Sequence, residues 1–545
     1  MSENQPHPMP SGKRLNSWKE IAAHLQRDVR TVQRWEKTEG LPVHRKLHDK
    51  LSSVYAYQEE LDAWWQAGSR ANASLAVTVQ PLRPMLVVLP LRNLSGDPVQ
   101  DYFSEGLTEE LTGQLGRLDP SRLGVIAYSS AARYRQNNQA IDQIARALRA
   151  SYVIEGSVRR DHDRVRISVA LVRVTDQSHL WSESYDRGLR DILTVQAEVA
   201  RAVAGEIAVK IPAAEQARLI HARPVDPAAY NAYLRGRYFW NQRTASALRT
   251  ALRCFEESVA RDPNHAPSHA GIADTYAVLS LIELGALAPS QAMPKAKAAA
   301  RRAIEIEPGM GEAYASLGLA QLWYEWDWNS AEQSFKKAIS LNAGYAPARQ
   351  WYAALLQTDD RMDEAVAEIG RALELDPLSL VIRSELAALM YFERQYDRAI
   401  AESEQALEMD PRFVLAYFNL GRAYTQKKMH SRAINALKQA YEFADGSPAV
   451  MMQLGHAYAA AGKKAEARHM LDSLAKLSRK GYVPAFYSAA IHTGLRDKER
   501  AFTALRRAYD ERCDYLVHLA KEPAADPLRS DPRFELLLPG PHRAV

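Results

Sequence analysis

The sequence predicts a multidomain, mainly α-helical protein in three parts: a small head of two helices and a hairpin, an α/β middle domain, and a C-terminal solenoid of helical pairs. Three observations predict this order. Residues 17–37 carry apolar side chains at helical spacing beside a basic face. Strand-like and helical stretches then alternate over residues 85–212. From about residue 227 onward, the chain repeats itself with a period of 34 or 35 residues.

The size and composition of the chain are those of a globular protein with several domains. Its 545 residues are 47% hydrophobic and 25% charged, which is an ordinary balance. The two cysteines, Cys254 and Cys513, exclude a disulfide framework and a cysteine-based zinc site, and they fit a reducing compartment. The first ten residues are polar and carry no signal peptide, and apolar runs such as residues 85–91 are too short to cross a bilayer. We therefore expect a cytoplasmic protein with no membrane partner.

The first helix of the head is predicted to begin after Ser17. Ser17 and Glu20 form a capping-box pattern, and apolar residues then recur at helical spacing as far as residue 25. Residues 26–28 break the pattern and predict a turn before a second helix. The apolar side of this second helix consists of Val29, Val32 and Trp35.

The opposite side of the second helix is polar and basic. Its residues are Arg30, Thr31, Gln33, Arg34 and Lys37. Such side chains bond phosphate oxygens and base edges, and a helix in this position normally lies in the major groove of duplex DNA. A basic run over residues 44–50 and strand-like residues 54–57 predict a hairpin, or wing, and residues 59–65 predict a closing helix.

Positive charge is concentrated in this head. Between Lys13 and Lys50 there are ten Lys or Arg residues and five acids, so the stretch carries +5, which equals the net charge of the whole chain. The remainder of the chain is therefore balanced. A local excess of this kind fits an electrostatic footprint for DNA.

The pattern SWKEIA…RTVQRWE…GLPVHR resembles the winged helix-turn-helix of the MerR and excisionase type. The resemblance covers about 50 residues and implies a DNA-binding domain at residues 12–70, with its second helix in the groove and Arg45 and Lys46 on the wing. The predicted DNA-binding residues are Arg30, Thr31, Gln33, Arg34, Lys37, Arg45, Lys46 and Lys50. The alternative is a small helical module that binds protein and has a solvated basic face.

Residues 71–84 form a predicted linker, and residues 85–212 form a predicted α/β domain. Its first strand is the continuous apolar run 85–91, which is typical of a strand buried on both faces. Further strands are predicted at residues 125–126, 152–158, 165–174 and 180–185. Helices are predicted at residues 103–115, 141–148 and 192–207.

Four strings of the middle domain, VVLPLRNLSGDP, DYFSEGLTEEL, YVIEGSVRR and HLWSESYDR, resemble the TolB amino-terminal-like, FlgO-like module. In bacterial chains this module often lies between a DNA-binding or cyclase domain and tetratricopeptide repeats. The resemblance does not define a ligand. Polar candidates at the strand ends are Asn93, Asp97, Glu105, Glu155 and Arg159. The alternative is that these side chains cap and close turns.

The C-terminal half of the chain is a predicted repeat array. Asp376 and Asp410, each followed by a proline, lie 34 residues apart. Alanines recur with the same period at positions 331, 365, 399, 433 and 467. Small residues let the two helices of a pair approach closely, and each pair buries its apolar face only against its neighbours. The pattern resembles the tetratricopeptide repeat family and predicts a superhelix of about eight units over residues 226–530, with an insertion near residues 284–293.

The concave surface of this superhelix is expected to hold a protein or peptide partner. The alternatives are a structural spacer and a dimerisation arm. Four aromatic residues in one unit could be mistaken for a ligand cage, namely Trp323, Tyr324, Trp326 and Trp328. We expect them to fill the gap left by a one-residue lengthening of that unit.

The chain is not expected to be an enzyme. It has no GxxxxGK[ST] loop, no HExxH and no GxSxG motif, and the three predicted domains leave no room for a cyclase catalytic domain. We expect no cofactor and no metal ion. His44 and His48 would have metal-ligand spacing only in a helix, and they lie in the predicted wing.

Together these features predict a soluble DNA-binding transcriptional regulator of bacterial type, whose repeats bind a protein partner or self-associate. Its partners would be double-stranded DNA, bound by a homodimer on paired half-sites, and a protein or peptide in the repeat groove. One alternative is a protein-interaction scaffold without DNA binding. Another is an enzyme that acts through the middle domain.

Overall fold

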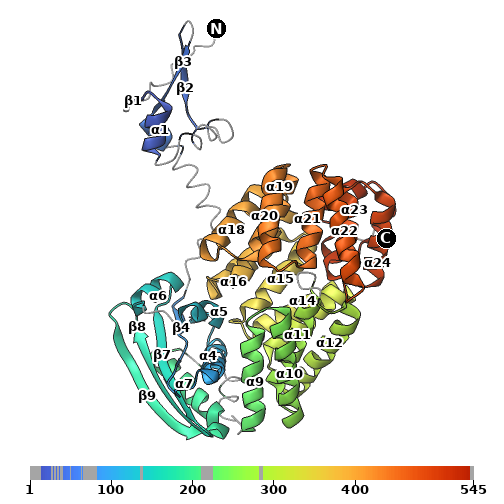
Figure 1. Ribbon diagram of the computed structural model, residues 1–545. Helices are drawn as coiled ribbons and strands as arrows, with labels where there is room; N and C mark the ends of the chain where they lie inside the picture. Colours follow the sequence, from blue (N-terminus) through green and yellow to red (C-terminus); the bar gives the residue numbers. More distant parts are fainter. Residues whose placement is uncertain are drawn as a thin grey trace, which may run out of the picture. The chain divides into compact units, whose positions relative to one another are not determined.

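Figure 1 shows the computed structural model of the chain, which describes residues 14–25, 29, 32, 36, 41–48, 51–62, 64, 83–135, 139–209, 211, 216, 225–281 and 286–540. The chain divides into two compact units, Met1–Val79 and Gln80–Val545. The described residues are mostly helical, with one three-stranded and one six-stranded sheet.

The described part of the N-terminal unit contains a short helix and a three-stranded antiparallel sheet. The helix α1 (Trp18–His24) precedes a hairpin of β2 (His44–His48) and β3 (Leu51–Tyr57). β3 is the central strand and pairs on its other edge with β1 (Arg14–Leu15). The hairpin that the sequence predicted is therefore present.

The helix α1 begins at its predicted cap. The Ser17 hydroxyl accepts a hydrogen bond from the Glu20 backbone N–H at 3.2 Å, and the Glu20 carboxylate accepts one from the Asn16 backbone N–H at 2.9 Å. The two side chains thus satisfy donors at the start of the helix, as a capping box does, although Glu20 reaches one residue further back than usual.

The second predicted helix lies mostly outside the described residues. Val29, Val32 and Glu36 are described and are helical. Val32 is fully buried, and Val29 packs against the same small core. Trp18 and Trp64 are also described, and both pack against this core.

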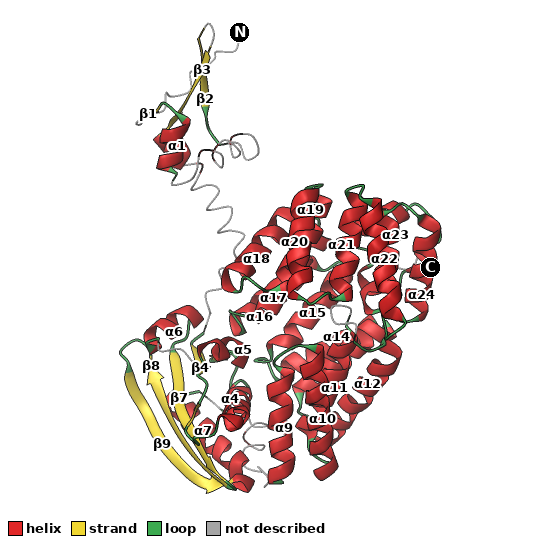
Figure 2. Cartoon of the chain, in the orientation of Figure 1, coloured by secondary structure: helices red, strands yellow, loops and turns green. Residues whose placement is uncertain are grey.

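The second unit begins with an α/β domain, whose sheet and helices Figure 2 colours separately. Its strands are β4 (Met85–Val88), β5 (Arg92–Asn93), β6 (Gly124–Val125), β7 (Tyr152–Asp161), β8 (Arg164–Arg173) and β9 (Ser178–Gly188). The order is β6-β4-β7-β8-β9, with β5 beside β7. β4, β5, β6 and β7 pair in parallel, whereas β7, β8 and β9 pair antiparallel. Its helices are α4 (Asp101–Leu115), α5 (Tyr128–Ala131), α6 (Ile141–Leu148) and α7 (Ile192–Glu206).

Side chains on both faces of β4 are buried. Leu86 and Val88 belong to the core that contains residues of α4 and α7, whereas Met85 and Val87 belong to a second core shared with α6 and the repeats. A strand that is buried on both faces needs a continuous apolar run, which explains the sequence pattern. The predicted apolar face of α4 is also confirmed: Phe103, Leu107, Leu111 and Leu115 are all buried.

The rest of the second unit is an array of helices. Eight consecutive pairs lie within the described part of residues 227–510, which is the predicted number. They are α9 (Pro227–Trp240) with α10 (Ala245–Arg261), α11 (Ala266–Ser280) with α12 (Pro289–Ile306), α13 (Gly311–Ala320) with α14 (Trp328–Leu341), α15 (Ala346–Thr358) with α16 (Met362–Leu375), α17 (Leu380–Phe392) with α18 (Tyr396–Met409), α19 (Val414–Gln426) with α20 (His430–Phe443), α21 (Pro448–Ala460) with α22 (Lys464–Ser478), and α23 (Ala485–Gly494) with α24 (Lys498–Asp510).

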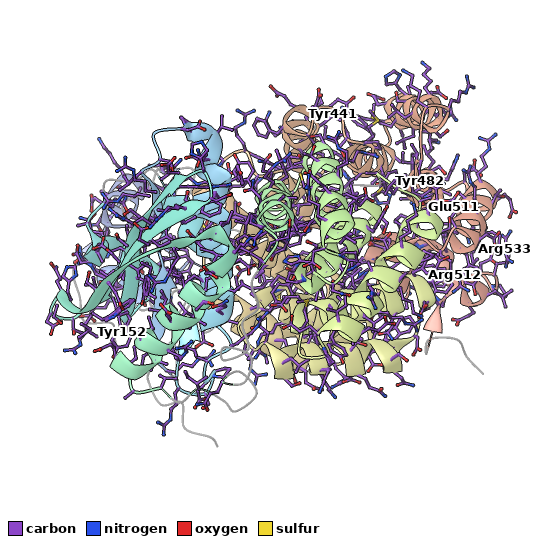
Figure 3. The ribbon with its side chains drawn as sticks, turned by 90° about the horizontal axis from the view of Figure 1, so that it is seen from below. Tyr152, Tyr441, Tyr482, Glu511, Arg512 and Arg533 are labelled. Atoms are coloured by element: carbon purple, nitrogen blue, oxygen red, sulfur yellow. The ribbon has the colours of Figure 1, made fainter. Side chains whose placement is uncertain are left out.

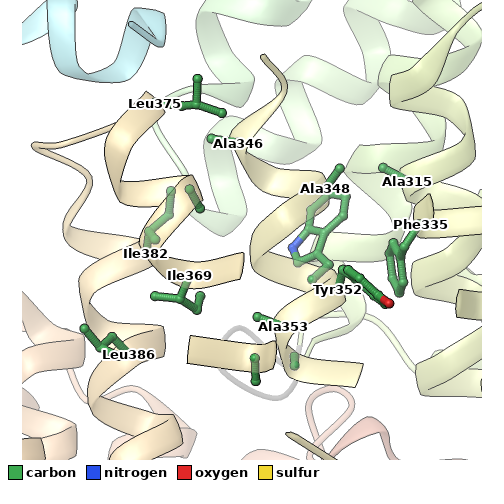
Figure 4. Packing of buried hydrophobic residues seen from close by; sticks show 14 of the residues in the cluster. Ala315, Phe335, Ala346, Ala348, Tyr352, Ala353, Ile369, Leu375, Ile382 and Leu386 are labelled. Atoms are coloured by element: carbon green, nitrogen blue, oxygen red, sulfur yellow. The ribbon is translucent and has the colours of Figure 1, made fainter. Parts of the chain in front are cut away.

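Small residues allow the close approach of the helices within a pair. A Cβ added at Gly318 would lie 2.9 Å from the Phe335 ring, and one at Gly421 would lie 2.3 Å from Leu437. Phe335 also packs against Tyr352 of the next pair, with ring centroids 6.3 Å apart, in the buried cluster of Figure 4. The periodic small residues of the sequence are therefore helix contacts, and each pair packs on its neighbours.

The aromatic residues near position 325 are packing residues, as expected. A π-helical turn at Gln321–Glu325 absorbs the extra residue of this unit. Trp323 and Trp328 are buried. Trp326 packs against Tyr509 at 4.9 Å, and the Arg512 guanidinium, labelled in Figure 3, lies 4.2 Å from the centre of its ring.

The structure differs from the prediction after α24. Residues 514–538, which we call the C-terminal segment, form short 3₁₀ turns at Asp514–His518, Pro523–Leu528 and Glu535–Leu537. Three prolines, at positions 523, 527 and 532, prevent a regular helix here. The segment continues the array without adding a helical pair.

Candidate functional site

Most of the predicted DNA-binding residues lie outside the described residues. These are Arg30, Thr31, Gln33, Arg34, Lys37 and Lys50. Lys46 lies in β2, and Arg45 of the same strand is exposed and forms an ion pair with Glu36 at 2.7 Å. The predicted DNA interface therefore stays a prediction.

The hairpin and β1 carry aromatic and basic side chains that contact one another. The Arg14 guanidinium lies 3.9 Å from the centre of the Tyr55 ring, and His44 stacks on the same ring at 5.2 Å. His44 also contacts the Glu60 carboxylate at 2.6 Å, so its ring is engaged by an acid. Within the described part of the chain, no group of three His, Cys, Asp or Glu side chains could hold a metal ion.

In the second unit, the α/β domain docks on the connections that lead into the first helices of successive pairs. The Ala127 backbone N–H donates to the Leu375 carbonyl at 2.7 Å. The hydroxyls of Ser129 and Ser130 each donate to the Asp376 carboxylate at 2.5 Å. Arg133 donates to backbone carbonyls before both α17 and α19. The domain is thus held by polar contacts to several repeats.

A second set of polar contacts joins α4 to the first pair of helices. The Tyr233 hydroxyl donates to Glu110 at 2.5 Å, and Arg237 forms an ion pair with Glu109. Desolvation raises the pKa of Glu110 against the opposing effect of the Tyr233 hydrogen bond. Apolar residues of α9 complete this contact, because Tyr230, Leu234 and Trp240 share a core with α4.

Between the α/β domain and the repeats lies a cavity of about 620 Å³. We call it the interdomain cavity. Its wall is formed by α4, α5, the end of α9, α11, and the starts of α13, α15, α17 and α19. The lining includes the five arginines Arg117, Arg133, Arg135, Arg237 and Arg243. It also includes the acids Glu105, Glu109, Glu110, Asp274, Glu312, Asp376 and Asp410.

Each acid in this lining accepts a hydrogen bond from a described residue. Glu105 is bound by Arg135 at 2.5 Å and by the Tyr128 hydroxyl at 3.1 Å, and Glu312 is bound by Arg117 at 3.1 Å. Burial raises the pKa of Glu105 even though Arg135 opposes the shift. Further acceptor contacts are Tyr345 to Asp274, Asn342 to Glu312, and the Arg412 backbone N–H to Asp410.

Asp274 is the most perturbed acid of the cavity wall. Desolvation raises its pKa to about 6, against the opposing effects of the Ser316 hydrogen bond and of Arg237 and Arg243. The Asp274 carboxyl therefore changes charge near neutral pH. A strongly perturbed acid in the wall of a cavity marks either a binding site or a structural ion-pair network.

The second contact between distant parts of this unit is made by the C-terminal segment. It lies against the first-helix face of the array, which is the face formed by α15, α17, α19 and α21. Glu522 is buried and accepts hydrogen bonds from Tyr391 at 2.5 Å and Tyr515 at 2.6 Å, and the Arg422 guanidinium lies 3.5 Å away.

Rings fill the rest of this second contact. His518 stacks on Phe392 with centroids 4.8 Å apart and an interplanar angle of 9°. The cavity that remains between the segment, α21 and α23 is only about 20 Å³. A peptide partner on this stretch of the first-helix face would have to compete with the chain's own residues.

The strand-end candidates of the sequence divide into two groups. Asn93 and Asp97 close and cap a turn, because each accepts a backbone N–H, from Ser95 and Val99 respectively, at 2.9 Å. Glu105 lines the interdomain cavity. Glu155 and Arg159 lie in β7 and not in the cavity wall.

Sequence reasoning missed Arg237, Arg243 and Asp274, which the fold brings together in the cavity wall. The only signal was the basic and aromatic string RGRYFWNQR at residues 235–243.

A family model for the tetratricopeptide repeat matches residues 426–483. The C-terminal part of the chain therefore carries tetratricopeptide repeats, a class of repeat that implies protein–protein interaction. No helix among the described residues is long and apolar enough to cross a membrane.

Two curated relatives match larger parts of the chain. "Putative adenylate cyclase 3" of Rhizobium meliloti is 34% identical over 264 residues, which cover 48% of this chain and 44% of that protein. The transcriptional regulator HilA of Salmonella typhimurium is 25% identical over 327 residues, which cover 58% of this chain and 56% of that protein. The chain thus spans about half the length of the curated relatives that it matches.

Two solved structures of helical repeat proteins match parts of the chain. Human IFIT1, in a dimer with PPP-AAAA, is 17% identical with a TM-score of 0.43, covering 64% of this chain and 85% of that chain. A thermophilic tetratricopeptide repeat protein of Thermus thermophilus is 21% identical with a TM-score of 0.30, covering 39% of this chain and all of that chain.

Proposed function

We propose that the chain is a DNA-binding transcriptional regulator. The observation that carries the proposal is the head, in which a capped helix and a hairpin surround a small core that includes Val32, beside a local charge of +5. Burial of Val32 and Val29 would leave the basic positions of the second helix facing outward, since the two sets lie on opposite sides of a helix. The similarity to the transcriptional regulator HilA favours the same class.

Within this proposal, the predicted DNA-binding residues have different roles. Arg30, Gln33 and Arg34 contact base edges and nearby phosphates from the second helix. Lys37, Arg45, Lys46 and Lys50 position the phosphate backbone. One copy of so small a head selects its site weakly, so a dimer on paired half-sites supplies the specificity.

The remaining parts would serve regulation. We propose domain boundaries at residues 12–70, 85–212 and 226–530, with a linker at 71–84. The middle domain is proposed to be of the TolB amino-terminal-like type, and the repeats to recruit a protein partner or to self-associate. Surfaces of the array that neither the α/β domain nor the C-terminal segment covers are available for such a partner.

The test is selection of genomic DNA fragments by the intact chain, followed by affinity measurements on the preferred site and on random DNA. Arg34→Ala should cost about 1–3 kcal/mol on the preferred site and relax its specificity, because a base-edge contact is lost. Lys46→Ala should weaken binding to both DNAs alike. It should also reduce the slope of log affinity against log salt concentration by about one unit. Arg261→Ala, an exposed arginine of α10, serves as the control and should change neither.

A second candidate function is an interaction scaffold without DNA affinity, which the repeat array itself favours. In that case the intact chain would select no DNA fragment, and Arg34→Ala would leave its lack of DNA binding unchanged. The cyclase activity named for the Rhizobium relative is not extended to this chain, which spans 44% of that protein.

A further inference from the structure

The interdomain cavity contains one guanidinium that has no acceptor among the described residues. Arg243 lies in the turn between α9 and α10, and its guanidinium is 3.6 Å from the centre of the Trp240 ring. Its side chain makes no hydrogen bond or ion pair with any residue that the structure describes. The other four arginines of the lining each bind a carboxylate or a backbone carbonyl.

This arrangement leaves a cation exposed to the cavity, with no described group of opposite charge bonded to it. Asp274 is near enough to interact electrostatically with Arg243, but the two do not form an ion pair. Burial lowers the pKa of Arg243, although the residue is only half-buried. A planar guanidinium with five N–H donors in such a setting is suited to bind a carboxylate through two hydrogen bonds.

We propose that the interdomain cavity binds a small carboxylic acid with an aromatic or aliphatic body, whose carboxylate pairs with Arg243. The charged residues of the lining restrict the ligand to a single negative charge. Seven acids face the cavity and four of its five arginines are already engaged, so a dianion such as a phosphate monoester would meet repulsion without a second free cation in the described lining. Below about pH 6, protonation of Asp274 reduces the repulsion that a single carboxylate meets.

The rest of the wall suits an uncharged body. Trp240 lies beneath the guanidinium, and Tyr238, Tyr345 and Phe413 also line the cavity. The volume of about 620 Å³ is in the range of pockets that enclose small organic molecules. Aromatic walls with a few fixed polar groups bind such molecules by burial of the body and orient them by the polar end.

A ligand in this place would contact both the α/β domain and the repeats. α4 and α5 supply one wall, and helices of the array supply the other. Because a molecule that binds only the docked arrangement stabilises it, the acid would strengthen the contact between the two parts. This inference goes beyond the proposed DNA binding, and its test uses no DNA, so either proposal can fail alone.

The experiment is isothermal titration calorimetry of the intact chain with probes that share a body and differ in charge. The probes are phenylacetate, phenyl phosphate, 2-phenylethanol and phenethylamine, with octanoate as an aliphatic acid. We expect phenylacetate or octanoate to bind, and the neutral, dianionic and cationic phenyl compounds to bind at least about tenfold more weakly. Arg243→Gln should weaken binding of the acid by about ten- to a hundredfold, and Arg243→Lys should weaken it by less.

Arg496→Gln is the matched control. Arg496 occupies the corresponding turn of the last helical pair, with a left-handed backbone like that of Arg243 (φ 61° and 54°), but it is exposed and does not line the cavity. Arg496→Gln should therefore leave the affinity for the acid unchanged. The proposal is wrong if neither acid binds the unaltered chain more tightly than Arg243→Gln, or if phenyl phosphate binds more tightly than phenylacetate. Circular dichroism of Arg243→Gln and Arg243→Lys verifies that both variants fold.

Discussion

The repeat array meets another part of its own chain in two places, and the two contacts differ in kind. The α/β domain docks through hydrogen bonds and ion pairs at the starts of the repeats, in addition to apolar contacts with α9, and leaves a cavity of about 620 Å³. The C-terminal segment packs through rings and apolar side chains on the first-helix face and leaves about 20 Å³. The first contact has room for a ligand, whereas the second is closed like a protein core.

The difference follows from the residues that each contact uses. Long charged side chains such as Arg117 and Arg237 span a gap and bind at their tips, so the space beside them stays open. Flat rings such as Phe392 and His518 stack without a gap. Close packing is characteristic of structural contacts, while a cleft with aromatic walls and a few polar groups is characteristic of binding sites. We therefore assign stability to the second contact and ligand binding to the first.

The largest expected effect is the loss of the buried acid in the second contact. Glu522→Ala leaves the Arg422 guanidinium buried without its carboxylate, and the hydroxyls of Tyr391 and Tyr515 lose their acceptor. Removing one partner from a buried charge pair costs about 3–5 kcal/mol. Urea unfolding of the intact chain measures the change in the free energy of unfolding.

The control lies in the same segment. Glu535 is exposed and stands in the last 3₁₀ turn, so Glu535→Ala should change the free energy of unfolding by no more than about 0.5 kcal/mol. Equal losses for the two variants would mean that the segment is not a structural contact.

A smaller effect is expected at the first contact, where Asp376 and Asp410 allow a matched comparison because they occupy the same repeat position 34 residues apart. Asp376→Ala leaves the hydroxyls of Ser129 and Ser130 without their acceptor. It should lower the free energy of unfolding by about 1–3 kcal/mol. Asp410 accepts only the nearby Arg412 backbone N–H among the described residues, so Asp410→Ala should cost less.

Hydrogen exchange locates the effect of Asp376→Ala. The amide of Ala127 donates across the same contact to the Leu375 carbonyl, so its exchange should accelerate in Asp376→Ala and not in Asp410→Ala. Unchanged exchange at Ala127 in both variants would show that the α/β domain is held mainly by other contacts.

The sequence predicted the parts of the second unit that depend on local periodicity. The 34-residue repeat indicated the eight pairs, and the apolar spacing of Phe103 to Leu115 indicated α4, because each pattern reflects burial within one helix and its neighbours. Residues 514–530, which the prediction included in the repeat array, form short 3₁₀ turns at Asp514–His518 and Pro523–Leu528 instead of a further helical pair. The one-residue lengthening near Trp326 was read correctly and corresponds to a π-helical turn.

The interdomain cavity could not be predicted, since it depends on contacts between residues far apart in the chain. Arg243 resembles any basic residue of a repeat turn, and only the fold places it in a cavity wall together with residues of α4 and α5. Asn93 and Asp97 illustrate the opposite case, because polar residues after a strand close a turn by local hydrogen bonds. The DNA-binding residues remain predictions from pattern and charge.

The smallest expected effect is the pH dependence of the second contact. His518 is stacked on Phe392, and desolvation, with the charge of Arg422 adding to it, lowers the pKa of His518 to about 3. The unfolded chain protonates this residue near pH 6.5, so it binds more protons than the folded chain, and stability falls as the pH drops below 6.5. Because part of the ring remains exposed, we expect a loss of about 1–2 kcal/mol between pH 6.5 and 4.5. Urea unfolding across this range gives the free energy of unfolding as a function of pH. Its slope should be shallower for His518→Gln than for the unaltered chain, and equal slopes would exclude His518 as the source of the pH dependence.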